Sequence, residues 1–281
     1  MPVDDDLGSR RANVIEQLRT ERRLVVALSG GVDSAVLLAL TVEALGSHAV
    51  VAVTGRSPAV TDPEIADAAA VASRFGVRHE IVATREMDNP RYVANAGDRC
   101  FHCRTELFGI LRAIALERAP ARVAYGAIVD DLGDDRPGMA AAEKFGVLAP
   151  LLEAGLDKVD VRLLARAWGL EVAEKPANAC LASRIPKGVP VTTARLSQVA
   201  RAESALRAMG FKLVRVRHHG DQARIEVPPE DIARLRAADV GRAIAAAGFL
   251  AHAIDPEGYR PAGSRRAGGL YSIEPQPDGG Q

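Results

Sequence analysis

The chain has 281 residues, of which 48% are hydrophobic and 26% are charged. This composition is typical of a globular protein with a substantial core and excludes an intrinsically disordered chain. The 36 basic residues balance the 36 acidic ones, so no net field attracts the chain to nucleic acid or to an anionic membrane, and we expect neither as a partner.

The amino-terminal sequence MPVDDDLGSRR begins with acidic residues and lacks the apolar stretch of a signal peptide. No later segment approaches the roughly 18 apolar residues that a membrane-spanning helix needs. We therefore expect a cytoplasmic protein. In a reducing compartment, the spacing of Cys100 and Cys103 indicates metal binding or redox chemistry rather than a disulfide scaffold.

Strands and helices alternate through the first part of the chain. Short apolar runs typical of buried parallel strands alternate with amphipathic segments. The predicted strands are 24–29, 48–55, 78–85 and 122–128, and the predicted helices are 10–20, 33–45, 62–75, 103–118 and 157–168. This order predicts an α/β domain over residues 1–175, with a parallel sheet covered by helices on both faces.

A loop rich in proline and small residues follows at 176–192 and carries Cys180. Beyond it we predict a smaller α+β domain over 193–260 that binds substrate or mediates oligomerisation. Its predicted elements are helices 194–209 and 230–246 and strands 211–219, 222–228 and 250–256. We expect the tail, 261–281, to be disordered at its end.

The segment SGGVDS (29–34) connects the first strand to the next helix. Glycines permit a sharp turn there, and the N–H groups at a helix N-terminus favour an anion such as phosphate. An ordinary turn capped by Asp33 or Ser34 would also satisfy Gly-Gly-x-Asp alone. The spacing is neither that of a Walker loop nor that of a dinucleotide-binding loop.

The order Ser-Gly-Gly-x-Asp-Ser resembles the pyrophosphate loop of the ATP pyrophosphatase superfamily, whose members split ATP between its α and β phosphates and adenylate a substrate. The resemblance implies that the loop backbone and four residues hold the leaving pyrophosphate: Ser29, Gly30, Gly31 and Ser34. Asp33 would help to position Mg²⁺. Thr54 ends the second strand, at the sheet edge where such folds bind ligands, and is a candidate for the adenosine contact.

Five further stretches carry a more specific resemblance. They are GDRCFHCRTELF (97–108), DDLGDDRPG (130–138), EAGLDKVDVRLLAR (153–166), KPANACLASRIPKGVPVT (175–192) and RVRHHGDQARIEV (215–227). From about residue 15 to about residue 260 the chain resembles the LarE family, ATP-dependent sulfur transferases that help to build the nickel-pincer nucleotide cofactor of lactate racemase. This implies an adenine nucleotide alpha hydrolase-like fold and a homo-oligomer.

The resemblance also implies a reaction. ATP adenylates a carboxylate of pyridinium-3,5-biscarboxylic acid mononucleotide, and pyrophosphate is released. Sulfur then attacks the activated carbonyl carbon and displaces AMP, which gives a thiocarboxylate. Activation is needed because the negative charge of a carboxylate shields its carbon from nucleophiles. Cations must then stabilise the charge that develops on the phosphate oxygens.

Cys180 matches the family's sulfur-handling position. In one version of the family a lone cysteine gives up its sulfur, and in the other three cysteines hold a [4Fe–4S] cluster that carries extra sulfide. With Cys100, Cys103 and Cys180 present, we favour the cluster. If Cys100 and Cys103 lie on one helical turn, their thiols share a face. Zinc bound with His102 or another histidine, or a redox disulfide, is the alternative.

Arg215 and Arg217 alternate along a predicted strand and so share a face, with Arg184 in the preceding loop. Guanidinium groups bind phosphate bidentately, so these arginines would clamp the phosphate of the mononucleotide. The alternative is a solvated strand face with ion pairs to Glu203 or Glu226. The resemblance implies that all five residues bind substrate and that Arg184 acts with Cys180 and Asp33 in catalysis.

Some positions depart from the family pattern or have a second explanation. Ala127 and Ile128 replace a polar pair near the nucleotide, and Lys187 stands where an aromatic residue is common. Lys175 would reach the ATP phosphates or cover apolar surface with its stem. A tRNA-thiolating enzyme would need a strongly basic surface or an RNA-binding domain, and a non-catalytic module would bind nucleotide without releasing pyrophosphate.

Overall fold

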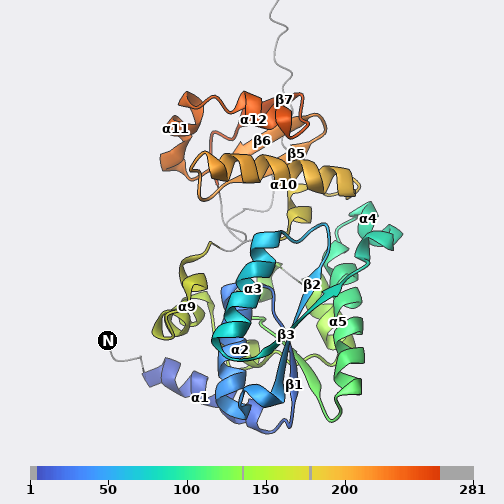
Figure 1. Cartoon of the computed structure of the whole chain (residues 1–281), viewed down its shortest axis with the longest axis vertical. Coiled ribbons are helices and arrows are strands. Elements are labelled where there is room, and N and C mark those ends of the chain that lie inside the picture. The colour runs from blue at the N-terminus through green and yellow to red at the C-terminus, as the bar shows by residue number, and fades with distance from the viewer. Residues whose placement is uncertain (1–4, 135, 177–178, 260–281) are drawn as a thin grey trace, which may run out of the picture.

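The larger part of the chain is built on a parallel sheet of four strands. In the computed structural model, which describes residues 5–134, 136–176 and 179–259, the strands are β1 (Leu24–Ala27), β2 (Val50–Arg56), β3 (Arg78–Ala83) and β4 (Arg122–Tyr125). Their order is β3-β2-β1-β4, and every neighbouring pair is parallel (Figure 1). The predicted parallel sheet is confirmed.

Helices cover both faces of this sheet, as predicted. Successive side chains of β1 point to opposite faces, so Val26 lies in one apolar core and Val25 in another. The first core is completed by α1 (Asp5–Arg19), α2 (Val32–Leu45), α3 (Asp62–Arg74) and α9 (Lys158–Ala167). The second is completed by α5 (Arg99–Glu117) and α7 (Arg136–Phe145).

Several short elements were not predicted. They are α4 (Pro90–Ala94), α6 (Asp131–Asp134), α8 (Pro150–Glu153) and the 3₁₀ turns η1 (Ser47–Ala49), η2 (Glu86–Asp88), η3 (Glu171–Glu174), η4 (Leu181–Arg184) and η5 (Pro229–Asp231). Such pieces are too short to show a periodic pattern in the sequence. Helix α5 begins at Arg99, earlier than predicted, and therefore carries both Cys100 and Cys103.

The smaller part contains a second sheet with a helix against it. Its elements are α10 (Thr193–Ala208), β5 (Arg215–His219), β6 (Gln222–Glu226), α11 (Ile232–Ala237), α12 (Gly241–Ala246) and β7 (Ala251–Ile254). The strand order is β5-β6-β7, with β5 antiparallel and β7 parallel to β6. The α+β architecture agrees with the prediction.

Two predicted elements of this part differ from the structure. The helix predicted at 230–246 is interrupted because Ala238 has an extended backbone after α11. The strand predicted at 211–219 begins only at Arg215, because the N–H of Phe211 bonds the carbonyl of Leu206 and keeps this segment on the end of α10.

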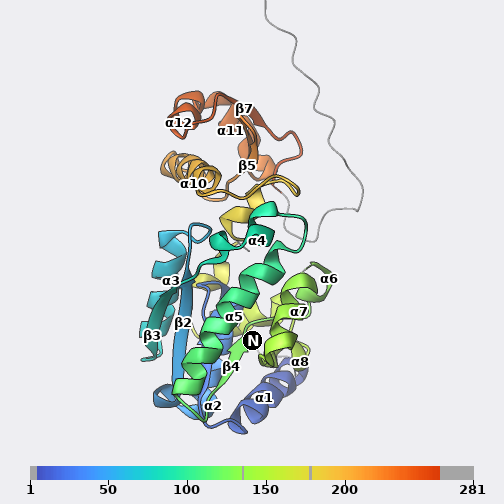
Figure 2. The same cartoon turned by 90° about the vertical axis from the view of Figure 1, so that its right-hand side faces the viewer.

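The junction after η3 is packed rather than loose. Leu181 and Val191 join the core of the smaller part, together with Tyr92 from α4. In both views α4 lies at the end of the larger part that faces the smaller one (Figures 1 and 2). Backbone hydrogen bonds from Leu181 to Ala59 and from Val191 to Val93 tie the junction down. The predicted domain boundaries stay a prediction.

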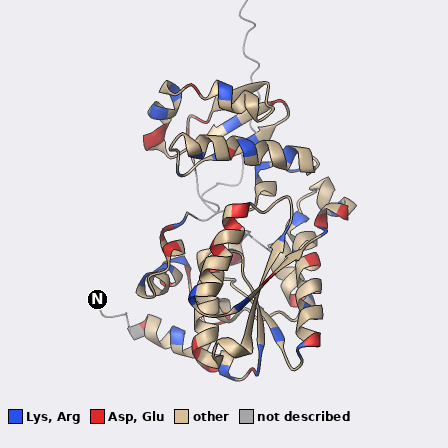
Figure 3. Cartoon of the chain, in the orientation of Figure 1, with Lys and Arg blue, Asp and Glu red and all other residues tan. Residues whose placement is uncertain are grey.

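Basic and acidic segments are interspersed over both parts (Figure 3). Within the described ranges, no helix is long and apolar enough to cross a membrane. The predicted tail, 261–281, lies outside the described residues, as do positions 177 and 178 of the predicted junction.

Candidate functional site

The loop between β1 and α2 is closed by its own hydrogen bonds. The hydroxyl of Ser34 donates to the carbonyl of Gly31 at 3.0 Å, accepts from the N–H of Ser29 at 3.2 Å and lies 3.1 Å from the Ser29 hydroxyl. Gly30 has φ +78°, and a Cβ there would lie 2.4 Å from the carbonyl oxygen of Glu64 on α3. Only glycine fits this position, because that oxygen belongs to a helix backbone.

The N-terminus of α2 is open to a ligand. Gly31 is the N-cap residue, and no described side chain caps this end of the helix. The alternative of a simple turn capped by Asp33 or Ser34 is wrong, because the N-cap residue is Gly31, while Ser34 bonds within the loop and Asp33 bonds Lys158. The first N–H groups of a helix that lacks a side-chain cap form a site for an anion.

Asp33 is held by a lysine that the sequence analysis did not identify. Nζ of Lys158, the first residue of α9, lies 2.8 Å from Oδ1 and 2.6 Å from Oδ2 of Asp33. Burial raises the pKa of Asp33, Lys158 opposes this, and the nearby carboxylates of Asp131 and Asp130 raise it further. The available signal was local, since Asp157 and Asp160 form a capping box that fixes the start of α9 around Lys158.

The end of β4 touches the loop from the other side. A Cβ on Gly126 would lie 2.8 Å from both the carbonyl carbon of Asp33 and the nitrogen of Ser34. Ala127 and Ile128, which replace the polar pair of the family pattern, are buried in the two cores that flank the sheet. Apolar packing therefore holds this strand end against the loop.

Thr54 uses its hydroxyl inside the sheet. The side chain is buried, and Oγ1 lies 2.6 Å from the carbonyl oxygen of Leu28 and 2.8 Å from Nε2 of His79. The hydroxyl donates to the carbonyl and accepts from the imidazole, whose pKa burial lowers. This leaves the backbone of the segment for a contact with adenosine, and the cofactor-binding role of Thr54 stays a prediction.

Lys175 is placed close to the loop by an ion pair with Asp67 on α3. Cβ of Asp67 would lie 3.2 Å from a Cβ on Gly30, so this ion pair is beside the glycines. The ammonium group of Lys175 therefore lies near the loop, as the ammonium group of Lys158 does.

The three thiols converge from two elements. Cys100 and Cys103 are the second and fifth residues of α5, Cys180 precedes η4, and no disulfide links the three. Burial raises the pKa of Cys103, and Cys180, Glu86 and Cys100 raise it further, so these groups lie within electrostatic reach of one another. Cys103 and Cys180 both pack against the core of the smaller part.

This arrangement is not a preformed metal site. Across the ranges that the structure describes, no group of three or more His, Cys, Asp or Glu side chains is placed to hold a metal ion. His102, named in the zinc alternative, is buried, and its Nε2 lies 2.9 Å from Oδ2 of Asp98. The cysteine spacing has brought the thiols together, but their role as ligands stays a prediction.

Arg184 is buried in contact with the backbone of Cys180. Its guanidinium pairs with Glu203 of α10 at 2.9 and 3.3 Å, and each side chain is only 1% exposed. It also donates to the carbonyl of Cys180 at 3.2 Å and to Oγ of Ser183 at 3.0 Å. The ion pair predicted as the alternative for Glu203 therefore exists and fixes the backbone that carries Cys180.

The arginines of β5 lie beside Arg184, as predicted. Arg217 forms a bidentate pair with Glu226 at 2.9 and 3.2 Å and donates to the carbonyl of Ser183 at 2.8 Å. The guanidinium of Arg215 lies 4.4 Å from the ring centre of Tyr259. Burial lowers the pKa of Arg215, and the charges of Arg184 and Arg217 lower it further.

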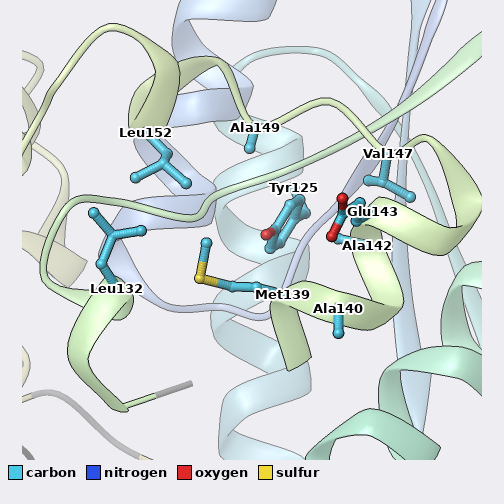
Figure 4. A pocket seen from close by; sticks show the side chains of 9 residues that line it. All are labelled: Tyr125, Leu132, Met139, Ala140, Ala142, Glu143, Val147, Ala149 and Leu152. Atoms are coloured by element: carbon cyan, nitrogen blue, oxygen red, sulfur yellow. The ribbon is translucent and has the colours of Figure 1, made fainter. Parts of the chain in front are cut away.

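A separate cavity of about 560 Å³ opens beside the end of β4. Figure 4 shows the ring of Tyr125 between Met139 and Glu143. The lining is mostly apolar and contains none of the predicted site residues: Tyr125, Leu132, Met139, Ala140, Ala142, Glu143, Val147, Ala149 and Leu152. Its contact with the loop is indirect, through the Gly126 that follows Tyr125.

Comparison with known proteins relates the chain to ATP-using enzymes. Residues 11–97 match the NAD synthase family. An uncharacterised protein of Synechocystis sp. is 41% identical over 258 residues, which cover 90% of this chain and 96% of that protein. The pyridinium-3,5-bisthiocarboxylic acid mononucleotide synthase of Lactiplantibacillus plantarum is 33% identical over 256 residues, 90% of this chain and 93% of that protein. A tRNA-specific 2-thiouridylase of Synechococcus sp. is 30% identical over 63% of this chain and 54% of that protein.

Proposed function

Because the chain belongs to the LarE family, that of the pyridinium-3,5-bisthiocarboxylic acid mononucleotide synthase, we propose that it is an ATP-dependent sulfur transferase. It adenylates carboxylates of pyridinium-3,5-biscarboxylic acid mononucleotide and converts them to thiocarboxylates. The observation that carries this proposal is the relationship along 90% of the chain, which includes both the loop and all three cysteines. The product would serve the nickel-pincer nucleotide cofactor of lactate racemase.

The loop would hold the triphosphate. The open N-terminus of α2, the N–H groups around Gly30 and Gly31, and the hydroxyls of Ser29 and Ser34 are suited to the leaving pyrophosphate. Asp33 would position Mg²⁺, which supplies positive charge to the phosphates. Lys158 would then turn from Asp33 to the phosphates, so that its ammonium group stabilises the charge that develops as the anhydride bond breaks.

The arginines would bind the mononucleotide. Arg184, Arg215 and Arg217 lie together behind Cys180, and a substrate phosphate would compete with Glu226 for the fork of Arg217. Glu203 would hold Arg184 in place while the substrate phosphate replaces Glu226 at Arg217. Both residues are buried, and the two carboxylate oxygens of Glu203 each contact the guanidinium of Arg184. Substrate and thiols would thereby meet at the junction between the two parts of the chain.

The donor set suits an iron–sulfur cluster. Three thiols converge, two of them pack against apolar side chains, and none is in a disulfide. Cys100, Cys103 and Cys180 would hold a [4Fe–4S] cluster. When bound, such a cluster would supply a site for inorganic sulfide. The competing version, in which Cys180 gives up its own sulfur, uses the same activated carboxylate.

Pyrophosphate release tests the function directly. The purified chain, incubated with ATP and Mg²⁺, should release pyrophosphate only when the dicarboxylate mononucleotide is added. Release that depends on tRNA would favour a thiolating enzyme instead, and ATP binding without release would indicate a non-catalytic module. The mass of the protein after turnover separates the two sulfur sources, because sacrifice of Cys180 removes about one H₂S and use of a cluster leaves the polypeptide mass unchanged.

We place the reaction in the cytoplasm, where free thiols persist. We also expect a homo-oligomer, as the family resemblance implies. Size-exclusion chromatography with light scattering measures the assembly.

A further inference from the structure

Two buried polar atoms near the thiols have no hydrogen-bond partner. Oε2 of Glu86 and the hydroxyl of Tyr92 are both without a partner among the described residues. Glu86 is only 2% exposed and Tyr92 only 1%. A buried polar group without a partner is costly, so such atoms point to a bound water or ligand.

Both groups lie on elements that pack against α5, the helix that carries two of the cysteines. Glu86 lies in η2 and Tyr92 in α4, the two short elements that precede the first turn of α5. Burial raises the pKa of Tyr92, and the neighbouring Cys180, Cys103 and Glu86 raise it further. Cys180 and Glu86 likewise raise the pKa of Cys103. A phenol, a carboxylate and the thiols therefore lie within electrostatic reach of one another.

Two arginine side chains, Arg99 and Arg104, also lie near these groups. Arg99 lowers the pKa of Tyr92, and Arg104 lowers that of Cys103. Nη1 of Arg99 is fixed by the carbonyl of Ala182 at 2.8 Å and by Oδ1 of Asn95 at 2.9 Å. These two guanidinium groups favour a small anion here, although the carboxylate of Glu86 and the thiols of Cys103 and Cys180 are also near.

The chemistry of the two unpartnered atoms defines the ligand. The hydroxyl of Tyr92 can donate a hydrogen bond, and a carboxylate oxygen such as Oε2 of Glu86 can accept one. The ligand must accept from one and donate to the other, and it must be small because the surroundings are packed side chains of the core of the smaller part. Hydrosulfide meets these conditions, since it has lone pairs for Tyr92 and one S–H for Glu86. Sulfate and phosphate are larger and, when fully ionised, have no proton for Glu86.

We propose that Glu86 and Tyr92 form a hydrosulfide-binding pocket beside the three thiols. This inference deepens the proposed function and rests on it, because it names the residues that hold the incoming sulfur. Tyr92 donates its O–H to the sulfur, and the S–H donates to Oε2 of Glu86. The step is binding alone, so no bond to sulfur is made or broken in it.

Direct binding of sulfide tests the pocket. The full chain, reconstituted anaerobically with iron and sulfide, is equilibrated with graded sodium sulfide and rapidly desalted, and the sulfide in excess of iron is measured. Wild type should retain excess sulfide, and Tyr92→Phe and Glu86→Gln should each need roughly tenfold more sodium sulfide for half-saturation, the effect of one lost hydrogen bond. Glu117→Gln, at the exposed last residue of α5, is the matched control and should bind as wild type.

Kinetics provide the second measurement. In thiocarboxylate formation at saturating ATP, the same two variants should raise the KM for sulfide about tenfold, with kcat and the pyrophosphate burst unchanged. The sulfide measurement needs no ATP, so it reads the pocket even where the pyrophosphate test of the proposed function fails. Wild type that retains no excess sulfide, variants that bind it like wild type because the pocket holds only water, or variants that lose iron in parallel would each overturn the proposal.

Discussion

The ammonium group of Lys158 lies 2.6 and 2.8 Å from the two carboxylate oxygens of Asp33, although 125 residues separate them in the chain. The contact joins the first turn of α9 to the first turn of α2. A cation therefore already occupies the carboxylate at which the family resemblance leads us to expect Mg²⁺. In the proposed reaction, Mg²⁺ would displace the ammonium group of Lys158 from Asp33 before ATP reacts.

Substitution of Lys158 tests this exchange. Lys158→Met should lower the rate of pyrophosphate release by about 100-fold, because one positively charged group is lost where phosphate charge develops. The Mg²⁺ concentration for half-maximal activity should fall, since the metal no longer competes with the ammonium group for Asp33. Steady-state assays at varied Mg²⁺ measure both effects. Lys212→Met, at an exposed position, is the control, and an unchanged rate in Lys158→Met would remove the lysine from the mechanism.

Gly126→Ala tests the contact between β4 and the loop. The added Cβ would lie 2.8 Å from the backbone of Asp33 and Ser34, so the loop must move. We expect the Kd for ATP, measured by calorimetry, to rise at least about tenfold, since misplaced N–H groups lose hydrogen bonds to phosphate. Gly133→Ala, where a Cβ meets nothing within 4 Å, should bind ATP as wild type does. Equal affinities in the two variants would contradict the close approach.

The buried pair of Arg184 and Glu203 should dominate the stability of the junction. Arg184→Met leaves the buried Glu203 with only the partly exposed Arg207 as an ionic partner among the described residues, which costs about 3 kcal/mol of unfolding free energy. The double variant Arg184→Met/Glu203→Leu should recover most of this loss, because neither charge then remains. Urea denaturation measures both values.

An exposed ion pair provides the control for this experiment. Arg166 pairs with Glu174 on the surface, so Arg166→Met should leave the midpoint of urea denaturation unchanged within error. If Arg184→Met were as stable as Arg166→Met, the buried pair would not hold the junction together.

The lowered pKa of His79 leads us to expect that the free energy of unfolding depends on pH. Its folded pKa is lowered by burial, so between that value and about 6.5 the unfolded chain binds more protons than the folded chain. The free energy of unfolding should therefore fall as the pH falls below about 6.5. His79→Gln keeps a donor for Thr54 but cannot titrate, and it should show a smaller fall. Identical pH profiles for the two proteins would contradict this assignment.

Local sequence patterns determined much of the fold. Apolar runs and amphipathic segments report burial, which is why the parallel sheet, its covering helices and the turn at 29–34 were predicted. The same patterns failed where no period exists, as in α4, or where a turn such as the one at Ala238 divides a continuous helical pattern. The helix was predicted only from residue 103, so the structure decided that Cys100 and Cys103 lie on the same helix.

What only the tertiary structure decided is which distant side chains meet. Lys158 reaches Asp33, Arg184 pairs with Glu203, and Glu86 with Tyr92 joins the cysteines because separate helices and turns pack end to end. The periodicity of a sequence predicts that a residue is buried, but it does not predict which side chain that residue contacts. Such contacts form only when long stretches of chain close into loops, and local sequence patterns carry no information about that closure.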